Sequence, residues 1–228
     1  MGLRLSKESR EVEMATYASL RHSSDTSGAE QIAKRVFDVV VASCILLFTA
    51  PLILTIAIFI RLQDGGPAVF KQMRLGKDGE QFACYKLRSM VTDAGDRLQQ
   101  LLATDPDARR EWAETQKLTN DPRITALGQF IRKSSIDELP QLFNVLWGDM
   151  SLVGPRPMMV DQRALYPGTA YYAMRPGITG IWQTSVRNES SFSERAIFDA
   201  RYFRELSFVT DLALIARTFR VVLRGTGY

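Results

Sequence analysis

Residues 39–60 read VVVASCILLFTAPLILTIAIFI and contain no charged side chain. A helix of that length reaches about 33 Å at about 1.5 Å per residue, close to the roughly 30 Å hydrocarbon core of a bilayer. A buried core helix is the alternative, but apolar runs of about 18 or more residues usually belong to membranes. The run therefore predicts a membrane-embedded helix.

The way this helix meets the membrane depends on Pro51 and on the charges at its two ends. Pro51 lies just past the midpoint of the run, where it removes one backbone hydrogen bond and bends a helix. Both flanks are basic, with Lys34 and Arg35 before the run and Arg61, Lys71, Arg74 and Lys77 after it. Basic flanks favour the cytoplasm. A helix that is broken at Pro51, and that enters and leaves by the same membrane face, keeps both of its flanks in the cytoplasm. An ordinary kinked transmembrane helix is the alternative, which the physics of the sequence alone slightly favours.

The remainder of the chain predicts a mixed α+β domain. Residues 68–74 and 81–88 resemble strands and flank Gly76-Lys77-Asp78-Gly79, in which Asp-Gly is a strong hairpin signal. Helical patterns mark residues 94–117, 136–148, 193–206 and 210–224. Residues 1–30 are polar and Ser-rich, which predicts a disordered tail and not a signal peptide, since no apolar segment lies near residues 5–20.

The last predicted helix, residues 210–224, is amphipathic. Its apolar positions follow i, i+3, i+4, i+7 spacing, and they are Leu212, Ile215, Ala216, Phe219, Val222 and Leu223. A second stripe consists of Arg217, Arg220 and Arg224. This pattern fits a helix on an anionic membrane surface and, equally, a core-packed helix with a solvated face. The apolar run upstream favours the membrane interface.

Histidine and cysteine are scarce, and this restricts the chemistry. The only histidine is His22, in the polar N-terminal stretch, and the only cysteines are Cys44, inside the apolar run, and Cys84. This scarcity argues against His/Cys zinc sites, Ser-His-Asp or Cys-His machinery and a disulfide framework. Any catalysis must come from Asp, Glu, Lys, Arg, Tyr or a bound cation. The net charge of +4 fits a phosphate-bearing partner, whether a nucleotide, a nucleic acid or an anionic membrane.

The densest group of such residues lies in the segment 121–157. It contains the adjacent carboxylates Asp137 and Glu138, with Arg132 before them and Arg156 after them in a Pro-flanked turn. Arginine binds phosphate oxygens in a bidentate manner, and a carboxylate can be a nucleophile or a cation ligand. These residue types together indicate phosphate chemistry.

A capping box is the alternative explanation of the carboxylate pair. Ser135-Ile-Asp-Glu138 has the S-x-x-E pattern that opens helices, and acidic residues are favoured in a first helical turn. Taken alone, the pattern favours this structural role. The two roles are compatible, because a helix N-terminus attracts anions and favours an ionised Asp137.

A longer signature runs through the same segment. Residues 131–157, IRKSSIDELPQLFNVLWGDMSLVGPRP, resemble the central motif of the bacterial sugar transferases, the small monotopic polyprenyl-phosphate phosphoglycosyl transferases. Further matches are Lys34-Arg-Val-Phe-Asp38, Tyr85-Lys-Leu-Arg-Ser-Met90, Asp121-Pro-Arg-Ile-Thr125 and Arg175-Pro-Gly-Ile-Thr-Gly-Ile-Trp-Gln183. The likeness covers about residues 31–228. It is closest to the exopolysaccharide-initiating galactose-1-phosphate transferases, judged by Glu111-Trp-Ala-Glu-Thr115 and the Gly-Thr-Gly-Tyr end.

The resemblance implies an α+β monotopic membrane protein with a re-entrant helix broken at Pro51, amphipathic interfacial helices and a small β-hairpin. The domains expected are a disordered tail at residues 1–30, a re-entrant membrane helix at 31–62 and a cytoplasmic catalytic domain with interfacial helices at 63–228. The implied location is the bacterial inner membrane, with the active site on its cytoplasmic face.

The resemblance also implies transfer of a sugar-1-phosphate, from UDP-galactose or UDP-glucose, to undecaprenyl phosphate as the first membrane step of exopolysaccharide synthesis. Asp137 would attack the β-phosphate, release UMP and hold the sugar-phosphate covalently until the polyprenyl phosphate attacks the adduct. Glu138 would bind magnesium together with Asp137, or assist proton transfer. By position, Arg156 and Arg132 would bind phosphate.

Other basic residues in or beside the matched motifs are expected to bind phosphate or substrate, namely Lys86, Arg88, Arg123 and Arg187. The chain departs from the family pattern at two places. Ala50-Pro51 replaces the frequent Ser-Pro at the helix break, which puts the serine's hydrogen-bonding role in doubt. Val186-Arg187-Asn188 replaces Gly-Arg-Asn, a difference that could bear on the choice of sugar.

Two further hypotheses remain open. One is a non-catalytic, membrane-tethered nucleotide-binding module, and the other is a scaffold subunit of a polysaccharide-assembly complex. A nucleic-acid partner is not expected, because no surface array of aromatic residues interleaved with basic ones is visible. The expected partners are therefore UDP-sugar, undecaprenyl phosphate and membrane lipids, and a homodimer remains open. Release of UMP from UDP-sugar distinguishes an enzyme from either alternative.

Overall fold

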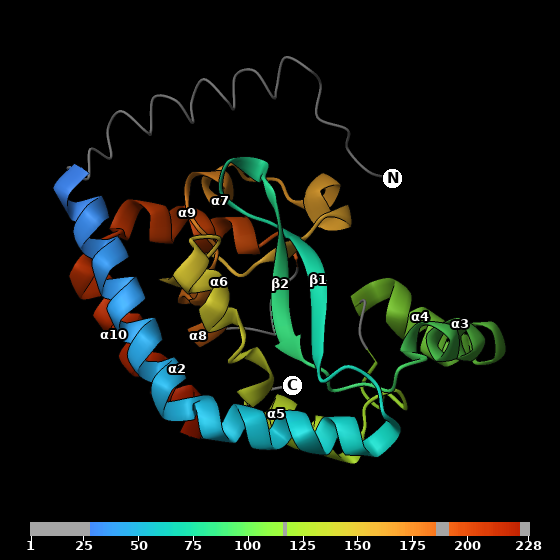
Figure 1. Ribbon diagram of the computed structural model, residues 1–228. Helices are drawn as coiled ribbons and strands as arrows, with labels where there is room; N and C mark the ends of the chain where they lie inside the picture. Colours follow the sequence, from blue (N-terminus) through green and yellow to red (C-terminus); the bar gives the residue numbers. More distant parts are fainter. Residues whose placement is uncertain (1–27, 116–117, 186–191, 224–228) are drawn as a thin grey trace. The chain divides into compact units, whose positions relative to one another are not determined.

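The described part of the chain combines helices with two small sheets, and the chain divides into two compact units. The computed structural model describes residues 28–115, 118–185 and 192–223 (Figure 1). Unit 1 takes its described residues from Met1–Phe48, Lys71–Tyr85 and Gln141–Val221, and unit 2 from Thr49–Phe70, Lys86–Pro140 and Val222–Tyr228. The predicted mixed α+β class is confirmed.

One long helix, α2, runs from Gly28 to Asp64 and includes Pro51. Within the described ranges it is the one helix long and apolar enough to cross a membrane, and only 17% of its most apolar part is buried. Its exposed side chains include Val40, Leu47, Phe48, Leu54, Ile58, Phe59 and Leu62. A core helix of a soluble domain would bury most of these side chains, so the exposure favours a membrane helix.

The predicted hairpin is confirmed (Figure 1). It consists of β1 (Val69–Leu75) and β2 (Gln81–Leu87), joined by a 3-10 turn, η1 (Lys77–Gly79). Asp78 and Gly79 in this turn have φ angles of 57° and 80°. The Asp-Gly signal worked because these two residue types tolerate the left-handed region best.

A third strand, β4 (Met158–Met159), extends this sheet in the order β2-β1-β4 and runs antiparallel to β1, with Leu75 opposite Met158. Tyr171 fastens the two strands, because its hydroxyl accepts from Met158 N at 3.0 Å and donates to Leu75 O at 2.5 Å. Leu75, Met158, Tyr166 and Tyr171 form a buried hydrophobic cluster of unit 1.

The second sheet of unit 1 has two parallel strands, β3 (Ser151–Val153) and β5 (Gly177–Thr179). Gly177 and Gly154 let their backbones approach closely, since a Cβ added to Gly177 would lie 2.0 Å from the Gly154 nitrogen. Glycine is therefore required here for close packing of backbone on backbone.

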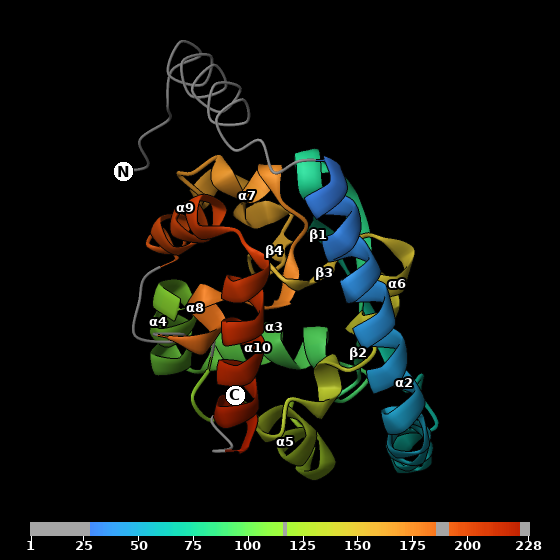
Figure 2. The ribbon, with the colours of Figure 1, turned by 90° about the vertical axis from the view of Figure 1, so that its left-hand side faces the viewer.

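Short helices complete unit 1. They are α6 (Gln141–Trp147), η3 (Asp161–Leu165), α7 (Ala170–Ala173), α8 (Ile181–Thr184), α9 (Arg195–Glu205) and α10 (Phe208–Leu223). Figure 2 shows α9 leading into α10, and these helices confirm the ones predicted at 193–206 and 210–224. The inward face of α10 is centred on Asp211 and Leu214, whereas Leu212 and Phe219 of the predicted apolar stripe are 44% and 63% exposed.

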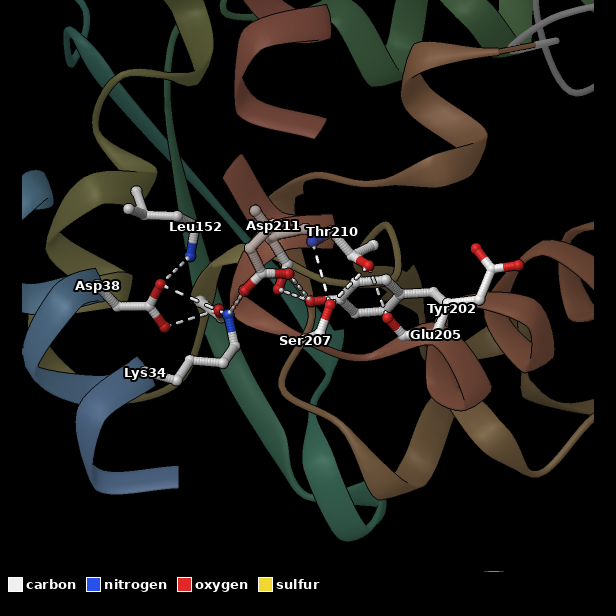
Figure 3. A network of polar contacts seen from close by, with 10 residues as sticks. Lys34, Asp38, Leu152, Tyr202, Glu205, Ser207, Thr210 and Asp211 are labelled. Atoms are coloured by element: carbon white, nitrogen blue, oxygen red, sulfur yellow. Dashed lines mark hydrogen bonds and ion pairs between the residues drawn. The ribbon is translucent and has the colours of Figure 1, made fainter. Parts of the chain in front are cut away.

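A buried polar network fixes the first turns of α2 in unit 1 (Figure 3). The Lys34 ammonium lies 2.6 Å from Asp211 Oδ2 and 3.7 Å from Asp38 Oδ1. Ser151 Oγ donates to Asp38 at 2.7 Å, and the Tyr202 hydroxyl donates to Asp211 at 2.6 Å. Both carboxylates are almost fully buried. Such partners are needed because an unpaired buried charge costs several kcal/mol.

Unit 2 contains the C-terminal half of α2 and several shorter helices, namely α3 (Ala94–Thr104), α4 (Pro106–Thr115), α5 (Ala126–Lys133) and η2 (Ile136–Glu138). Its buried core consists of Ile56, Ile60, Leu87 and Ile131. Residues from α2, from the end of β2 and from α5 thus meet in one cluster.

Prolines divide two helices that the sequence pattern predicted as continuous. The helix predicted at 94–117 is α3 followed by α4, because Pro106 cannot continue a helix but fits a first turn. Asp105 caps α4 by accepting two of its backbone N–H groups. The helix predicted at 136–148 is likewise η2 followed by α6, with Pro140 between them.

Gly177→Ala tests the close approach of β3 and β5. The added methyl group must displace backbone, so we expect a loss of about 1–3 kcal/mol or more in the free energy of unfolding. Thermal unfolding of the protein in lipid nanodiscs measures it. Gly95→Ala is the control, because nothing lies within 4 Å of its Cβ position inside α3. Equal melting temperatures for the two variants would contradict the close approach.

Candidate functional site

The carboxylate pair Asp137 and Glu138 lies on η2, in a sharp turn that follows α5 in unit 2. Ser135 adopts a left-handed conformation with φ 58°, and its side chain makes no cap hydrogen bond. The capping-box explanation is therefore wrong, because Ser135 presents its backbone carbonyl, not its hydroxyl, to the N–H of Glu138, at 3.2 Å. A left-handed non-glycine residue costs about 1–3 kcal/mol, and such residues cluster at active sites and ligand-binding turns as well as in tight hairpins.

Burial differs within the pair. Asp137 is 9% exposed, whereas Glu138 is half-buried. The Lys86 ammonium, at the end of β2, lies 2.8 Å from Glu138 Oε1. Of the predicted phosphate-binding residues, Lys86 is thus brought directly to the carboxylate pair. A cation beside two adjacent carboxylates offsets their mutual repulsion.

The Asp121-Pro-Arg-Ile-Thr125 motif leads into α5. Thr125 caps that helix, since its hydroxyl accepts from Gly128 N at 2.9 Å. Arg123 forms a bidentate pair with Asp121, at 2.8 and 2.6 Å, and lies over the Trp112 ring, 5.2 Å from its centroid. Arg123 therefore already has a carboxylate and an aromatic partner inside unit 2, which gives it a clear structural role.

Arg132, near the end of α5, interacts electrostatically with the carboxylate of Asp121. Burial raises the pKa of Asp121, but the hydrogen bonds from Arg123 outweigh that effect, and the charge of Arg132 lowers the pKa further. The net result is a pKa below its ordinary value. Arg132 stands two residues before the turn at Ser134–Ser135 and is half-buried. Arg132 is therefore close in sequence to Asp137 and Glu138.

Arg88 is held by the end of α2. Its two Nη atoms lie 2.6 and 2.5 Å from the two oxygens of Asp64, and Nη2 also donates to Ile60 O at 3.3 Å. The hydrogen bond from Arg88 lowers the pKa of Asp64 to about 2. Arg88 is buried, so this pair anchors the end of the apolar helix to the end of β2 within unit 2.

Arg156 belongs to unit 1, where it lies half-buried in the turn between β3 and β4. Arg187, the last predicted phosphate-binding residue, lies outside the described residues. Two arginines that the sequence did not indicate as site residues, Arg74 and Arg195, bond the backbone of the Arg156 turn. Their roles arise from tertiary contacts, which no local sequence pattern predicts.

The carboxylate pair Asp137 and Glu138 is of the kind that holds magnesium in proteins. Across the described ranges, no group of three or more His, Cys, Asp or Glu is placed to hold a metal ion. Magnesium is usually bound through one or two carboxylates together with substrate phosphates. Asp137 and Glu138 supply such a pair.

Comparison with known proteins identifies one matching family and several similar proteins. The bacterial sugar transferase family matches residues 29–225. An undecaprenyl-phosphate galactose phosphotransferase of Salmonella typhimurium is 48% identical over 201 residues, which cover 87% of this chain and 42% of that protein. The exopolysaccharide production protein ExoY of Rhizobium meliloti is 42% identical over 198 residues, which cover 86% and 88% of the two chains.

A more distant relative acts on glucose, by its name. The UDP-glucose:undecaprenyl-phosphate glucose-1-phosphate transferase of Escherichia coli is 36% identical over 209 residues, covering 87% of this chain and 41% of that protein. The chain thus spans about two fifths of the length of the Salmonella and Escherichia relatives.

Arg88→Gln and Asp64→Asn test whether the Arg88–Asp64 pair is structural. Either change leaves a partner without its opposite charge, so we expect the melting temperature to fall by several degrees. The depressed pKa of Asp64 means that its stabilisation is complete above the ordinary value of 3.8 and is lost as the pH falls towards about 2. The difference in melting temperature between wild type and Asp64→Asn should therefore shrink over that pH range. An Arg88→Gln variant of unchanged melting temperature that no longer binds UMP would make Arg88 a substrate ligand instead.

Proposed function

We propose, from the chain's membership of the bacterial sugar transferase family, that it transfers a sugar-1-phosphate from a UDP-sugar to undecaprenyl phosphate and releases UMP. The reaction would be the first membrane step of exopolysaccharide synthesis. The observation that carries the proposal is the Asp137–Glu138 pair, held on a strained turn beside Lys86 inside the family's match. The names of the relatives support galactose or glucose as the sugar.

Asp137 is the proposed nucleophile. Its carboxylate oxygen attacks the β-phosphorus, the bond from that phosphorus to the bridging oxygen breaks, and UMP leaves with the electron pair. The product is an acyl phosphate that carries the sugar. An oxygen of undecaprenyl phosphate then attacks the same phosphorus, breaks the bond to Asp137 and regenerates the carboxylate. No histidine occurs within the described residues, so a carboxylate is the best available nucleophile.

Several charged side chains would prepare this step. Glu138, with Asp137, would hold a magnesium ion, which supplies charge neutralisation on the diphosphate. Lys86 keeps Glu138 oriented through their 2.8 Å ion pair. Arg132 and Arg156 would bind phosphate oxygens, and Arg187 is proposed for substrate binding on the motif alone. Arg88 and Arg123 would contribute by stabilising the surroundings, because each already forms a bidentate pair with an aspartate.

For the membrane, we propose that residues 31–62 form a re-entrant helix and that residues 63–228 form the cytoplasmic domain, with the site on the cytoplasmic face of the inner membrane. Pro51 lacks the N–H that would bond the preceding turn, and the Thr55 hydroxyl donates to the Pro51 carbonyl at 2.8 Å, a contact that favours helix bending. On α10, Phe208, Val209, Leu212 and Phe219 are exposed, which supports an interfacial position for that helix.

Asp137→Asn tests the nucleophile. Incubation with radiolabelled UDP-galactose and magnesium, without lipid acceptor, should leave label on wild-type protein and none on Asp137→Asn, whose neutral amide cannot form the acyl phosphate. Turnover with acceptor should fall by about 10³-fold or more, as expected when a covalent catalyst is removed. Glu138→Gln should also be severely impaired. Asp161→Asn, at an exposed carboxylate, is the matched control and should behave as wild type.

The outcomes separate the hypotheses. Full activity in Asp137→Asn would end the proposed mechanism. Wild-type protein that binds UDP-galactose but releases no UMP, with or without undecaprenyl phosphate, would make the chain a nucleotide-binding or scaffold subunit.

The topology is tested by labelling cysteines from outside intact cells. In a Cys44→Ala, Cys84→Ala background, single cysteines at the exposed positions Ala29 and Gln63 should both resist a membrane-impermeant maleimide, because both ends of a re-entrant helix are cytoplasmic. Pro51→Ala should shift the helix towards spanning, since it restores a backbone hydrogen bond. In the protein that keeps Pro51, labelling at one of the two positions and not at the other would establish a spanning helix.

A further inference from the structure

The turn that carries Arg156 is tied down by backbone hydrogen bonds on its first two residues. Gly154 N donates to Thr179 O at 2.9 Å, and Gly177 N donates to Pro155 O at 2.8 Å. Both partners belong to β5, which lies close to β3 and the residue after it because Gly177 has no side chain. The entry to the turn is therefore fixed by the sheet.

The last two residues of the turn are bonded by guanidinium groups. Arg195 Nη2, on α9, donates to Arg156 O at 2.6 Å, and Arg74 Nη1, on β1, donates to Pro157 O at 3.2 Å. All four carbonyl or N–H contacts come from within unit 1. Two elements distant in sequence thus hold the backbone on which the Arg156 side chain stands, and they do so with charged donors.

Burying charged hydrogen-bond donors at this place costs free energy. Arg195 is 6% exposed and lies against the Trp182 and Phe192 rings, with centroids 5.2 and 5.0 Å away. Burial lowers the pKa of Arg195, and the neighbouring charge of Arg156 lowers it further. Burial and Arg156 have the same two effects on the pKa of Arg74. The three guanidinium groups therefore repel one another in a poorly hydrated region.

Within the described part of unit 1, Arg195 has a carboxylate nearby. Asp199, one turn along α9 from Arg195, raises the pKa of Arg195. Burial raises the pKa of Asp199 itself to about 6, against the hydrogen bond from Tyr166 and the charge of Arg195. The buried Nε–H groups of Arg74 and Arg195 find no acceptor among the described residues, which adds to the cost of burying both guanidinium groups.

We propose that Arg74 and Arg195 are positioning residues for Arg156: their hydrogen bonds lock the backbone of the turn from which the Arg156 side chain reaches a phosphate group. The inference rests on the proposed function, which makes Arg156 a ligand of phosphate. A locked backbone avoids the free-energy cost of ordering the turn when a phosphate group binds. The phosphate could come from the nucleotide or from the lipid acceptor, because both present the same oxygens.

A double-mutant cycle tests this role in the full chain in lipid nanodiscs with magnesium. Arg195→Gln and Arg74→Gln keep a hydrogen-bond donor but lose the charge. Each should raise the Kd for UMP, measured by calorimetry, about 10-fold, the loss expected for a displaced charge-assisted contact. Added to Arg156→Ala, either change should raise the Kd less than about twofold, because a positioning residue has nothing left to position. If UMP binding is unaffected but the KM for undecaprenyl phosphate rises with the same non-additivity, the lipid supplies the phosphate.

Arg35→Gln is the matched control. Arg35 also donates to backbone carbonyls in unit 1, those of Val145 and Leu146, at 2.6 and 3.0 Å, but not to the Arg156 turn. Any loss it causes should multiply with that of Arg156→Ala. If Arg195→Gln or Arg74→Gln lowers the melting temperature sharply, Arg195→Lys and Arg74→Lys, which keep the charge, replace them in the cycle.

Two results would overturn the inference. One is unchanged UMP binding and unchanged KM values in both glutamine variants. The other is multiplicative loss, as for Arg35→Gln, which would make both arginines merely structural. A distinct result, wild-type affinity and turnover in Arg156→Ala, would refute the proposed phosphate-binding role of Arg156 itself.

Discussion

Polar anchors at the two ends of α2 are the constraint on which the rest of the structure depends. A helix that leaves most of its apolar side chains exposed gains little from packing against protein, so hydrophobic burial alone cannot hold it in place. In unit 1, Lys34 and Asp38 bond into a buried network with Asp211. In unit 2, Asp64 forms a bidentate pair with the buried Arg88, beside the apolar contacts of Ile56 and Ile60. Each unit thus attaches its part of the helix through charges that lie outside the apolar run.

Ion pairs also hold the surroundings of the carboxylate turn in unit 2, where Lys86 pairs with Glu138 and Arg123 with Asp121. The arginines at the Arg156 turn in unit 1 act differently, because Arg195 and Arg74 donate to the backbone carbonyls of Arg156 and Pro157. Arg88 and Arg123, each in a bidentate pair with an aspartate, therefore stabilise unit 2. Arg74 and Arg195 instead fix the backbone that carries Arg156.

Local signals in the sequence predicted local structure well. Asp78-Gly79 predicted the hairpin because left-handed φ angles are a property of those residues, and the periodicity of residues 193–206 and 210–224 predicted α9 and α10. The breaks at Pro106 and Pro140 were missed, because apolar periodicity continues across each proline while the backbone cannot. The conformation of Ser135 was also missed, since nothing in S-x-x-E distinguishes a capping hydroxyl from a left-handed turn. The contacts of Arg74 and Arg195 join β1, α9 and the Arg156 turn, and no local pattern encodes such a meeting.

The central claim is that a carboxylate of this chain takes the sugar-phosphate before the lipid acceptor arrives. Isotope exchange tests it most directly: purified protein in nanodiscs is incubated with magnesium, UDP-galactose and radiolabelled UMP, with no undecaprenyl phosphate present. A covalent intermediate makes the first half-reaction reversible on its own, so label should appear in UDP-galactose. Transfer to undecaprenyl phosphate at full rate, combined with no exchange in its absence, would contradict the account and require direct attack of the lipid on the nucleotide sugar.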